Sequence, residues 1–301
     1  MYNGILLLHK EPGFTSHDAV AKLRGVLRFR RIGHAGTLDP MAQGLLVILL
    51  GPAARASEYA SGADKEYVAE FVLGVETDTQ DTTGIVLAEK PVQIDRKALE
   101  EAIASFAGGY DQTPPMYSAI QKNGVRLYDL ARQGKEVERE SRYIRLPQLE
   151  LLEYQPPQGR LRVCCSKGGY VRTLCHDIGQ KLGCGAAMSG LTRLRAGQFR
   201  LEDALKLEEV RQLHEAGELE RKILPVDSVF SALPAVTLTP EGARRAMNGA
   251  HAAQRHVAQG EIPPPGNLCR VYGPKGEFIM AGKGGLLEAG PPAIFCHKMF
   301  A

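Results

Sequence analysis

Hydrophobic positions recur along the chain at two spacings, which predict a mixture of strands and helices. Apolar residues at every second position predict strands, as in the run that carries Tyr67, Ala69 and Phe71. Apolar residues three or four apart predict helices, as with Leu23 downstream of Ser16, a residue type suited to a helix N-cap. The strands predicted on this basis are 4–9, 45–50, 65–74, 85–88, 142–152 and 161–166, and the helices are 17–29, 95–107 and 170–182. The chain is therefore expected to fold as an α+β protein.

The spacing of apolar positions changes after Leu233-Pro234. One short helix is expected at 240–247, and glycine- and proline-rich connections then separate short strands. These strands are predicted at 268–271, 278–281 and 293–297. The sequence therefore predicts two domains, residues 1–232 and residues 233–301, of which the second is small and rich in β-strand.

A glycine-rich segment, 33–44, interrupts the pattern. It contains three glycines and a proline, and it therefore predicts a tight loop. Asp39 lies at its centre, and the apolar run 45–50 that follows predicts a strand buried on both faces. A carboxylate on a stiff loop beside a core strand is suited to catalysis. The alternative is that Asp39 only closes a turn before Pro40, as aspartate commonly does.

The charges are segregated along a chain that is otherwise ordinary in composition, with 44% hydrophobic and 24% charged residues and a net charge of +3. Between Asp18 and Asp39 every charged residue is basic, and between Glu153 and Glu202 eight basic residues face one acid, Asp177. Such segregation favours a surface that binds a polyanion such as nucleic acid. The alternative is that the basic residues occupy exposed helix faces.

The apolar runs and the cysteines bear on location and metal binding. No apolar run approaches the ~20 residues of a membrane span, and the short run at 5–8 lacks the features of a signal peptide. The six cysteines form no C-x-x-C pair, so we expect reduced thiols in a cytoplasmic protein. Cys175, His176 and Cys184 resemble part of a zinc site, but buried thiols are the expected state because a fourth ligand is missing.

Two further segments carry candidate binding groups. The stretch 112–134 begins with a Pro-Pro pair and interleaves tyrosine with arginine, which predicts a surface loop and a short helix that bind a ligand. Arg172 falls in the first turn of the helix predicted at 170–182, where a cation is mildly unfavourable. A carboxylate partner is therefore expected beside it, although a surface ion pair would fit the same position.

Several blocks of sequence, taken together and in order, resemble the TruB-type tRNA pseudouridine synthases. These enzymes convert uridine 55 in the T loop of tRNA to pseudouridine. The blocks are Lys10-x-Pro12-Gly13-x-Thr15-Ser16, Gly33-His34-x-Gly36-x-Leu38-Asp39-Pro40-x-Ala42-x-Gly44, Lys65-x-Tyr67, Pro114-Pro115-x-Tyr117-Ser118-Ala119, Cys165-Ser166-Lys167-Gly168-x-Tyr170-x-Arg172-x-Leu174 and Leu191-x-Arg193-Leu194-Arg195. They span residues 1 to about 230.

The resemblance implies a fold and a set of site residues. The expected fold is a catalytic domain with a mixed, mostly antiparallel sheet, flanking helices and an inserted RNA-binding thumb loop, followed by a PUA-like RNA-binding domain. Asp39 is the expected catalytic carboxylate and Arg172 its salt-bridge partner. The residues expected to bind the flipped nucleotide or the space that it leaves are His34, Tyr67, Tyr170 and Leu191. From the residues alone, a tyrosine at the spacing of Tyr67 is usually a core strand residue, and a histidine in a glycine-rich loop such as His34 is more often a plain turn residue.

The implied reaction requires neither a cofactor nor a metal, because uracil is detached, rotated and rejoined within one nucleotide. The sequence leaves open whether Asp39 attacks ribose C1′, attacks base C6 or removes a ribose proton. The T stem-loop of tRNA is the expected partner, and a monomer without membrane contact or an obligate protein partner is expected. The family commonly has Leu-Lys after Tyr-Ser-Ala, whereas here Ile120-Gln121 follows, which removes one basic group from the thumb. A guide-RNA-dependent pseudouridine synthase and a non-enzymatic RNA-binding protein are the alternatives.

Overall fold

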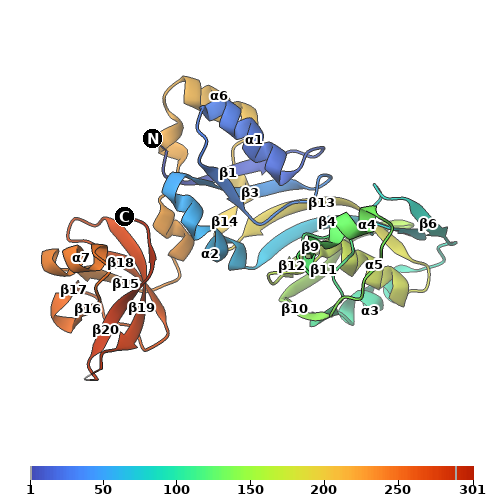
Figure 1. The fold of residues 1–301 in the computed structure, drawn as a ribbon. Coiled ribbons are helices and arrows are strands. Elements are labelled where there is room, and N and C mark those ends of the chain that lie inside the picture. Colours follow the sequence, from blue (N-terminus) through green and yellow to red (C-terminus); the bar gives the residue numbers. More distant parts are fainter. Residues whose placement is uncertain (1, 289) are drawn as a thin grey trace.

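The computed structural model describes residues 2–288 and 290–301, which form two large sheets (Figure 1). The first has eight strands in the order β1-β3-β13-β4-β12-β11, with β2 and β14 paired to β3 and β13. Its strands are β1 (Gly4–Lys10), β2 (Ile32–Ala35), β3 (Gln43–Leu50), β4 (Lys65–Leu73), β11 (Gln148–Gln155), β12 (Gln158–Cys165), β13 (Ala186–Ala196) and β14 (Phe199–Arg200). Among the described residues, the pairing of β13 with β3 is parallel and the other pairings of this sheet are antiparallel. The predicted α+β fold with a mixed, mostly antiparallel sheet is confirmed.

The loop that carries Asp39 directly precedes β3, and the strand that pairs with one edge of β3 changes from β13 to β2 along its length. The second half of β3, from Val47 to Leu50, pairs with β2. The first two residues of β3 pair instead with β13, through Gln43–Thr192 and Gly44–Arg193. Residues 44–50 are all buried, as the apolar run predicts. The loop 36–42 is therefore anchored to a core strand at the point where β2 gives way to β13.

Helices pack against the sheet around separate cores. Alternate residues of β3 face different cores, because Ile48 packs with α1 and α6, whereas Val47 packs in a cluster with Phe230. A third core lies between β4, β12 and β13 and the helices α3 and α5, and it contains Phe71 and Leu174. The helices are α1 (Ser16–Leu27), α3 (Arg96–Ala104), α5 (Val171–Lys181) and α6 (Leu207–Glu215).

The start of α1 differs from the prediction. Thr15, not Ser16, is the N-cap: its side chain accepts a hydrogen bond from the Asp18 N–H, and the Asp18 carboxylate accepts one from the Thr15 N–H. Ser16 is instead buried, and its hydroxyl bonds to the main chain of Leu38. The capping box therefore frees Ser16 to hold the loop next to Asp39.

The strand predicted at 142–152 is in fact two strands in different sheets. β10 (Arg142–Leu146) pairs with β7 (Gly108–Gln112), whereas β11 pairs with β12. Pro147 separates them, because proline lacks the N–H that a continuous ladder requires. The long strand β13 was not predicted, since register shifts near Gly190 and Arg195 break its alternation.

Two segments lie outside the first sheet. One is the hairpin of β5 (Val75–Thr77) and β6 (Val86–Glu89), and the loop between these strands lies near the start of α5. The other is the segment 113–141, which connects β7 to β10, the two strands of a separate small sheet. It contains β8 (Gln121–Lys122), β9 (Val125–Arg126) and α4 (Leu127–Arg132), in agreement with the predicted loop and short helix.

The second sheet is built from the last part of the chain. Its strand order is β16-β20-β19-β18-β15-β17, and α7 (Pro240–Met247) packs beside it. Its strands are β15 (Ala235–Leu238), β16 (Ala252–Ala253), β17 (Val257–Gln259), β18 (Leu268–Tyr272), β19 (Phe278–Leu286) and β20 (Pro292–Met299). The sheet lies beside the N-terminal sheet and carries the C-terminus (Figure 1).

An aromatic cluster joins the two sheets. Phe230 ends the 3-10 helix η4 (Val226–Phe230), and its ring lies 4.9 Å from that of Tyr59 in α2 (Ser57–Gly62) and 5.5 Å from that of Phe300. The Phe278 ring of β19 lies 5.3 Å from that of Phe300. Residues on both sides of position 232 therefore share one core, and the proposed boundary at 232/233 stays a prediction.

Candidate active site

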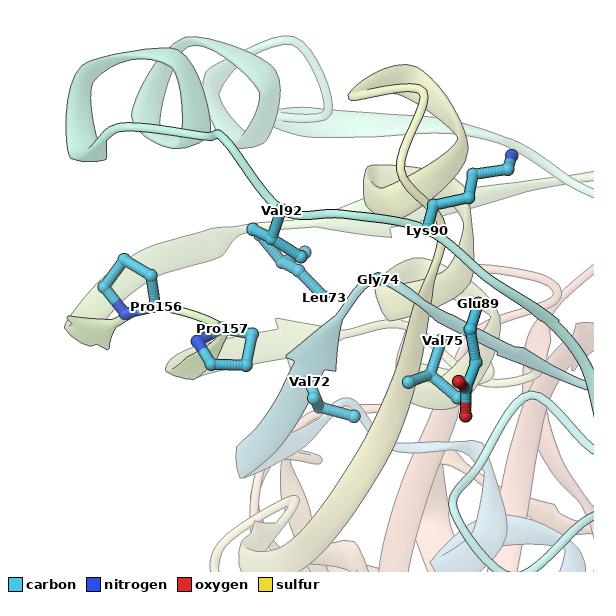
Figure 2. Close-up of a pocket in the computed structure, with 9 residues that line it drawn as sticks. All are labelled: Val72, Leu73, Gly74, Val75, Glu89, Lys90, Val92, Pro156 and Pro157. Carbon is cyan, nitrogen blue, oxygen red and sulfur yellow. The ribbon is translucent and has the colours of Figure 1, made fainter.

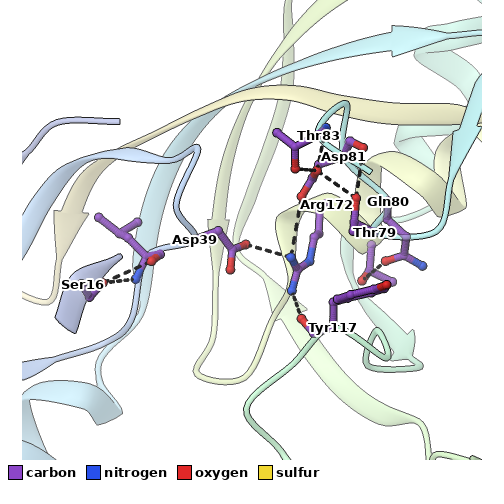
Figure 3. A network of polar contacts seen from close by, with 10 residues as sticks. Ser16, Asp39, Thr79, Gln80, Asp81, Thr83, Tyr117 and Arg172 are labelled. Atoms are coloured by element: carbon purple, nitrogen blue, oxygen red, sulfur yellow. Dashed lines mark hydrogen bonds and ion pairs between the residues drawn. The ribbon is translucent and has the colours of Figure 1, made fainter. Parts of the chain in front are cut away.

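The loop before β3 brings Asp39 to the first turn of α5. Arg172 is the second residue of that helix, and its Nη1 atom lies 3.3 Å from Asp39 Oδ2 (Figure 3). The Arg172 side chain is 7% exposed and the Asp39 side chain 33% exposed. The carboxylate expected beside the arginine is thus present, and it keeps one side open to an incoming molecule.

A second carboxylate, which the sequence analysis did not single out, lies against the same guanidinium. Asp81 Oδ2 is 3.8 Å from Arg172 Nη1, and the Asp81 side chain is buried. Its Oδ1 atom accepts hydrogen bonds from Thr79 Oγ1 (2.9 Å), Thr83 Oγ1 (2.6 Å) and the Thr83 N–H (3.0 Å). Arg172 is therefore enclosed between two carboxylates, one open and one buried. The only feature of the sequence that indicates this role of Asp81 is the set of threonines that surround it in a polar turn.

A further hydrogen bond of Arg172 comes from the segment 113–141. The Arg172 Nη2 group donates a hydrogen bond to the carbonyl oxygen of Tyr117 (Figure 3). The Tyr117 hydroxyl in turn donates to Asp78 Oδ2 at 2.9 Å. Beside it on α5, the Thr173 hydroxyl donates to Gln80 Oε1 at 2.7 Å. The arginine side chain is thus held by three segments that are far apart in sequence.

Buried polar groups hold the loop on both sides of Asp39. The Ser16 hydroxyl accepts from the Leu38 N–H at 2.8 Å and donates to the Leu38 carbonyl at 3.2 Å. On the other side of Asp39, Lys10 Nζ donates to the carbonyls of Ala42 (2.6 Å) and Pro40 (3.3 Å). A loop without regular hydrogen bonding leaves buried carbonyl groups without partners, and these side chains supply them.

Arg193 holds the two ends of the same loop. Its guanidinium donates to the carbonyls of Gly36 at 2.9 Å and Leu45 at 2.6 Å, and the side chain is almost fully buried. The Arg193 main chain lies so close to Gly44, which has φ +104°, that a Cβ there would be 2.4 Å from the Arg193 carbonyl oxygen. Glycine is therefore required at this crossing of β3 and β13.

The surroundings of Asp39 act on its ionisation in opposite directions. Burial raises the pKa of its carboxyl group above the ordinary value, and the charge of Asp81 adds to that effect. The guanidinium of Arg172 and the ammonium of Lys10 lower the pKa of Asp39. Burial also lowers the pKa of Lys10 to about 8. The net effect is a pKa of Asp39 above the ordinary value, and the positive charges of Arg172 and Lys10 limit that rise.

One of the predicted binding residues lies beside this ion pair, and two others pack in a core cluster with the residue that precedes Asp39. Tyr170 directly precedes α5, and its ring centroid is 5.7 Å from the Arg172 guanidinium carbon. Tyr67 of β4 and Leu191 of β13 belong to the core cluster that also contains Leu38. Tyr67 is 7% exposed, and burial raises its pKa to about 12. The ring of Tyr67 is therefore a buried core group in the free protein.

His34 is placed differently from the other predicted residues. It lies on β2, opposite Ile48 of β3, rather than in the loop itself. Burial lowers the pKa of its imidazole, and the charges of Arg193 and His17 add to the effect. The structure therefore brings His34 near the base of the loop without a contact to the Asp39 carboxylate.

Other features of the described residues do not add a second site of this kind. A groove of about 450 Å³ lies between the hairpin β5–β6 and the turn at Pro156-Pro157, and Val72, Val75 and Lys90 contribute to its lining (Figure 2). None of the predicted site residues lines it. Residues 2–288 and 290–301 contain no metal-ligand cluster of three or more His, Cys, Asp or Glu residues. None of the helices in these ranges is both long and apolar enough to cross a membrane.

Comparison with protein families agrees with these motifs. Residues 24–171 match the model of the TruB family pseudouridylate synthases, N-terminal domain. Residues 172–231 match the model of the tRNA pseudouridylate synthase B C-terminal domain. The two matches adjoin each other between Val171 and Arg172, so together they include the loop of Asp39 and the start of α5.

Curated relatives and solved structures extend the similarity over most of the chain. The tRNA pseudouridine synthase B of Syntrophotalea carbinolica is 42% identical over 93% of this chain and 91% of its own length. That of Opitutus terrae is 48% identical over 78% of this chain and 96% of its own length. A chain in the structure of an H/ACA RNP bound to a substrate RNA containing 2′-deoxyuridine has a TM-score of 0.76 and 26% identity, covering 99% of this chain and 85% of that one. A chain of a Cbf5–Nop10–Gar1 complex has a TM-score of 0.77 and 27% identity, with the same coverage. The protein therefore belongs to the TruB family of pseudouridylate synthases.

Proposed function

We propose that this protein isomerises uridine to pseudouridine at position 55 in the T loop of tRNA, with Asp39 as the catalytic carboxylate. The observation that carries the proposal is the ion pair between Asp39 and Arg172, in which the buried partner is the cation and the open partner is the carboxylate. An aspartate that only closed a turn would not require a buried guanidinium 3.3 Å away.

The reaction rearranges one nucleotide without gain or loss of electrons. The bond between ribose C1′ and uracil N1 breaks, the uracil turns, and a bond forms between C1′ and C5. The C5 proton leaves to solvent and N1 takes up a proton. Asp39 would assist the cleavage as an anion, by attack at C1′, by attack at C6 or by removing a ribose proton. Arg172 would hold the carboxylate in position and keep it ionised.

The nucleotide must leave the folded RNA before Asp39 can reach it, at a cost of a few kcal/mol. Stacking on an aromatic ring returns about 1–3 kcal/mol per base. Tyr170 is suited to this role because its ring lies beside the Arg172 guanidinium, and Tyr67 and Leu191 would line the apolar end of the site. His34 would contact the space that the nucleotide leaves. The segment 113–141 would hold the RNA, and residues 233–301 would act as a second, PUA-like RNA-binding domain.

A guide-RNA-dependent pseudouridine synthase is the second candidate function, because chains of H/ACA complexes have a similar fold. Identity is higher to tRNA pseudouridine synthase B, at 42% over 93% of the chain. We therefore propose that the protein acts in the cytoplasm as a monomer, without a guide RNA or an obligate protein partner. A protein that only bound RNA would not need the arrangement of Asp39, Asp81 and Arg172.

Tritium release tests the proposal directly. The purified protein alone is incubated with a T-stem-loop RNA that carries 5-tritiated uridine at position 55, because rejoining through C5 expels that hydrogen. Release from this RNA, absent when the tritiated uridine is placed only in the stem, is the expected result. Release that occurs only after a guide RNA is added would favour the second candidate, and binding without release under either condition would contradict both.

A further inference from the structure

A glutamine at the root of the segment 113–141 makes two hydrogen bonds to the main chain of one active-site residue. Gln112 Oε1 accepts from the Tyr170 N–H at 2.8 Å, and Gln112 Nε2 donates to the Tyr170 carbonyl at 3.0 Å. The glutamine is 3% exposed, so water does not offer these groups an alternative partner. The side-chain amide of Gln112 thus forms hydrogen bonds with both main-chain polar groups of Tyr170, its N–H and its carbonyl.

These two hydrogen bonds lie at the start of α5, the helix that carries Arg172. Tyr170 is the N-cap residue of α5, and its own side chain makes no capping hydrogen bond. Arg172 follows two residues later, so a shift of the Tyr170 main chain moves the first turn of the helix and the guanidinium with it. Gln112 therefore fixes the start of a helix that lacks an ordinary cap.

A second link connects Gln112 to the same helix further along. Its Nε2 group also donates to the Tyr110 hydroxyl at 2.6 Å, and that hydroxyl donates to Asp177 Oδ2 at 2.8 Å. Gln112 is the last residue of β7, and Arg142, where the chain returns, lies opposite it in β10. The glutamine thus connects α5 to the point at which the segment 113–141 leaves the body of the protein.

We propose that Gln112 is a positioning residue of the reaction, which holds the main chain of Tyr170 and thereby the guanidinium of Arg172 against Asp39. This inference rests on the proposed function of Asp39 and Arg172.

The test is Gln112→Met, which keeps the length of the side chain and removes the two hydrogen bonds to Tyr170 together with the one to the Tyr110 hydroxyl. We expect kcat for the T-stem-loop RNA to fall by about tenfold or more, since small displacements in a catalytic site have effects of this size. The Kd for the same RNA should stay within about twofold, because Gln112 is buried.

The acidic limb of the dependence of kcat/KM on pH should move to higher pH. Arg172 would act less on Asp39, while the other charged groups that act on it, Lys10 and Asp81, stay in place.

Two further variants separate positioning from a general loss of stability. Tyr154→Phe removes one partly buried hydrogen bond, 2.9 Å to the Ile94 carbonyl, in another part of the first sheet. It should change neither kcat nor the acidic limb. Gln112→Asn is one methylene shorter and cannot reach both groups of Tyr170, so it should lower kcat as Gln112→Met does, and it decides the matter if the latter does not fold.

The outcomes distinguish this inference from the function on which it rests. An active wild-type protein together with an equally active Gln112→Met variant and an unmoved acidic limb would overturn the role of Gln112 alone. A fall in kcat without a shift of the limb, shared by Tyr154→Phe, would show a structural effect and would also overturn it. An inactive wild-type protein would instead contradict the proposed function.

Discussion

The surroundings of the Asp39 carboxyl group include features that disfavour its ionised form and others that favour it. Its burial favours the neutral form, whereas Arg172 and Lys10 favour the ionised form. A carboxylate that is poorly solvated and still ionised is a stronger nucleophile and base than one in water. The balance among these groups therefore sets the pH range in which the protein is active.

Replacing Asp81 by asparagine tests this balance. The variant keeps the shape of the side chain and removes a negative charge that raises the pKa of Asp39. The acidic limb of kcat/KM should therefore move to lower pH, measured by tritium release at a series of pH values. We also expect kcat to fall, because Arg172 loses the carboxylate on its buried side. A limb that moves to higher pH would contradict the assignment of the limb to Asp39.

The raised pKa of Asp39 also predicts how the free energy of unfolding depends on pH. The folded-state pKa of Asp39 lies above the unfolded value of 3.8, so the unfolded chain binds fewer protons between these two values. The free energy of unfolding therefore falls as pH rises through this window, and the loss persists at pH 7. Asp39→Asn should accordingly raise Tm at pH 7 while it abolishes activity, as measured by thermal unfolding with the wild type as reference. A lower Tm at pH 7 would show that the ion pair stabilises the fold.

At the scale of elements, the position of Asp39 depends on the crossing of β3 and β13. Gly44 has φ +104°, and a Cβ there would meet the main chain of Arg193 at 2.4 Å. Gly44→Ala should therefore lower the free energy of unfolding by about 2 kcal/mol or more, because it adds backbone strain and a collision. The measurement is equilibrium unfolding in denaturant.

Gly25 offers a matched control for that substitution. It lies on the exposed side of α1 and has no atom within 4 Å of an added Cβ. Gly25→Ala should raise the free energy of unfolding by about 0.5–1 kcal/mol, because alanine favours a helix interior. Equal effects of the two substitutions would contradict the account of the crossing.

The elements also show what the sequence could and could not predict. The loop of Asp39 and the helix start at Arg172 have local signals, namely the glycines and the cation in a first turn, and the structure brings them together. Asp81 was missed because a polar turn gives no sign that one of its aspartates is buried. Ser16 was assigned to the wrong contact because its true partner, Leu38, lies 22 residues away. Contacts of this kind depend on tertiary packing, which local patterns do not encode.

At the scale of the whole molecule, the two large sheets share a core that contains large aromatic side chains. Phe230 is 3% exposed and packs against rings from both sides of the joint. Phe230→Ala should cost about 3–5 kcal/mol and should uncouple the unfolding of residues 233–301 from the rest. Thermal unfolding followed by two probes would then give transitions that no longer coincide.

The exposed aromatic residue of the second sheet is the control for this prediction. Phe295 is 37% exposed on β20, so Phe295→Ala should have a much smaller effect on stability and should leave the transitions coincident. If Phe230→Ala unfolds in a single transition as well, the two sheets form one cooperative unit and the proposed boundary at 232/233 fails.

The central claim is that the Asp39 carboxylate performs the isomerisation, and a single-turnover comparison tests it most directly. Wild-type protein and Asp39→Asn, each in excess over a T-stem-loop RNA with 5-tritiated uridine at position 55, are followed by tritium release and by RNA binding. We predict complete release by the wild type and none by the variant, with the Kd for RNA unchanged within about threefold, because the substitution removes one charge and leaves the binding surface intact. Release by Asp39→Asn at the wild-type rate would contradict it.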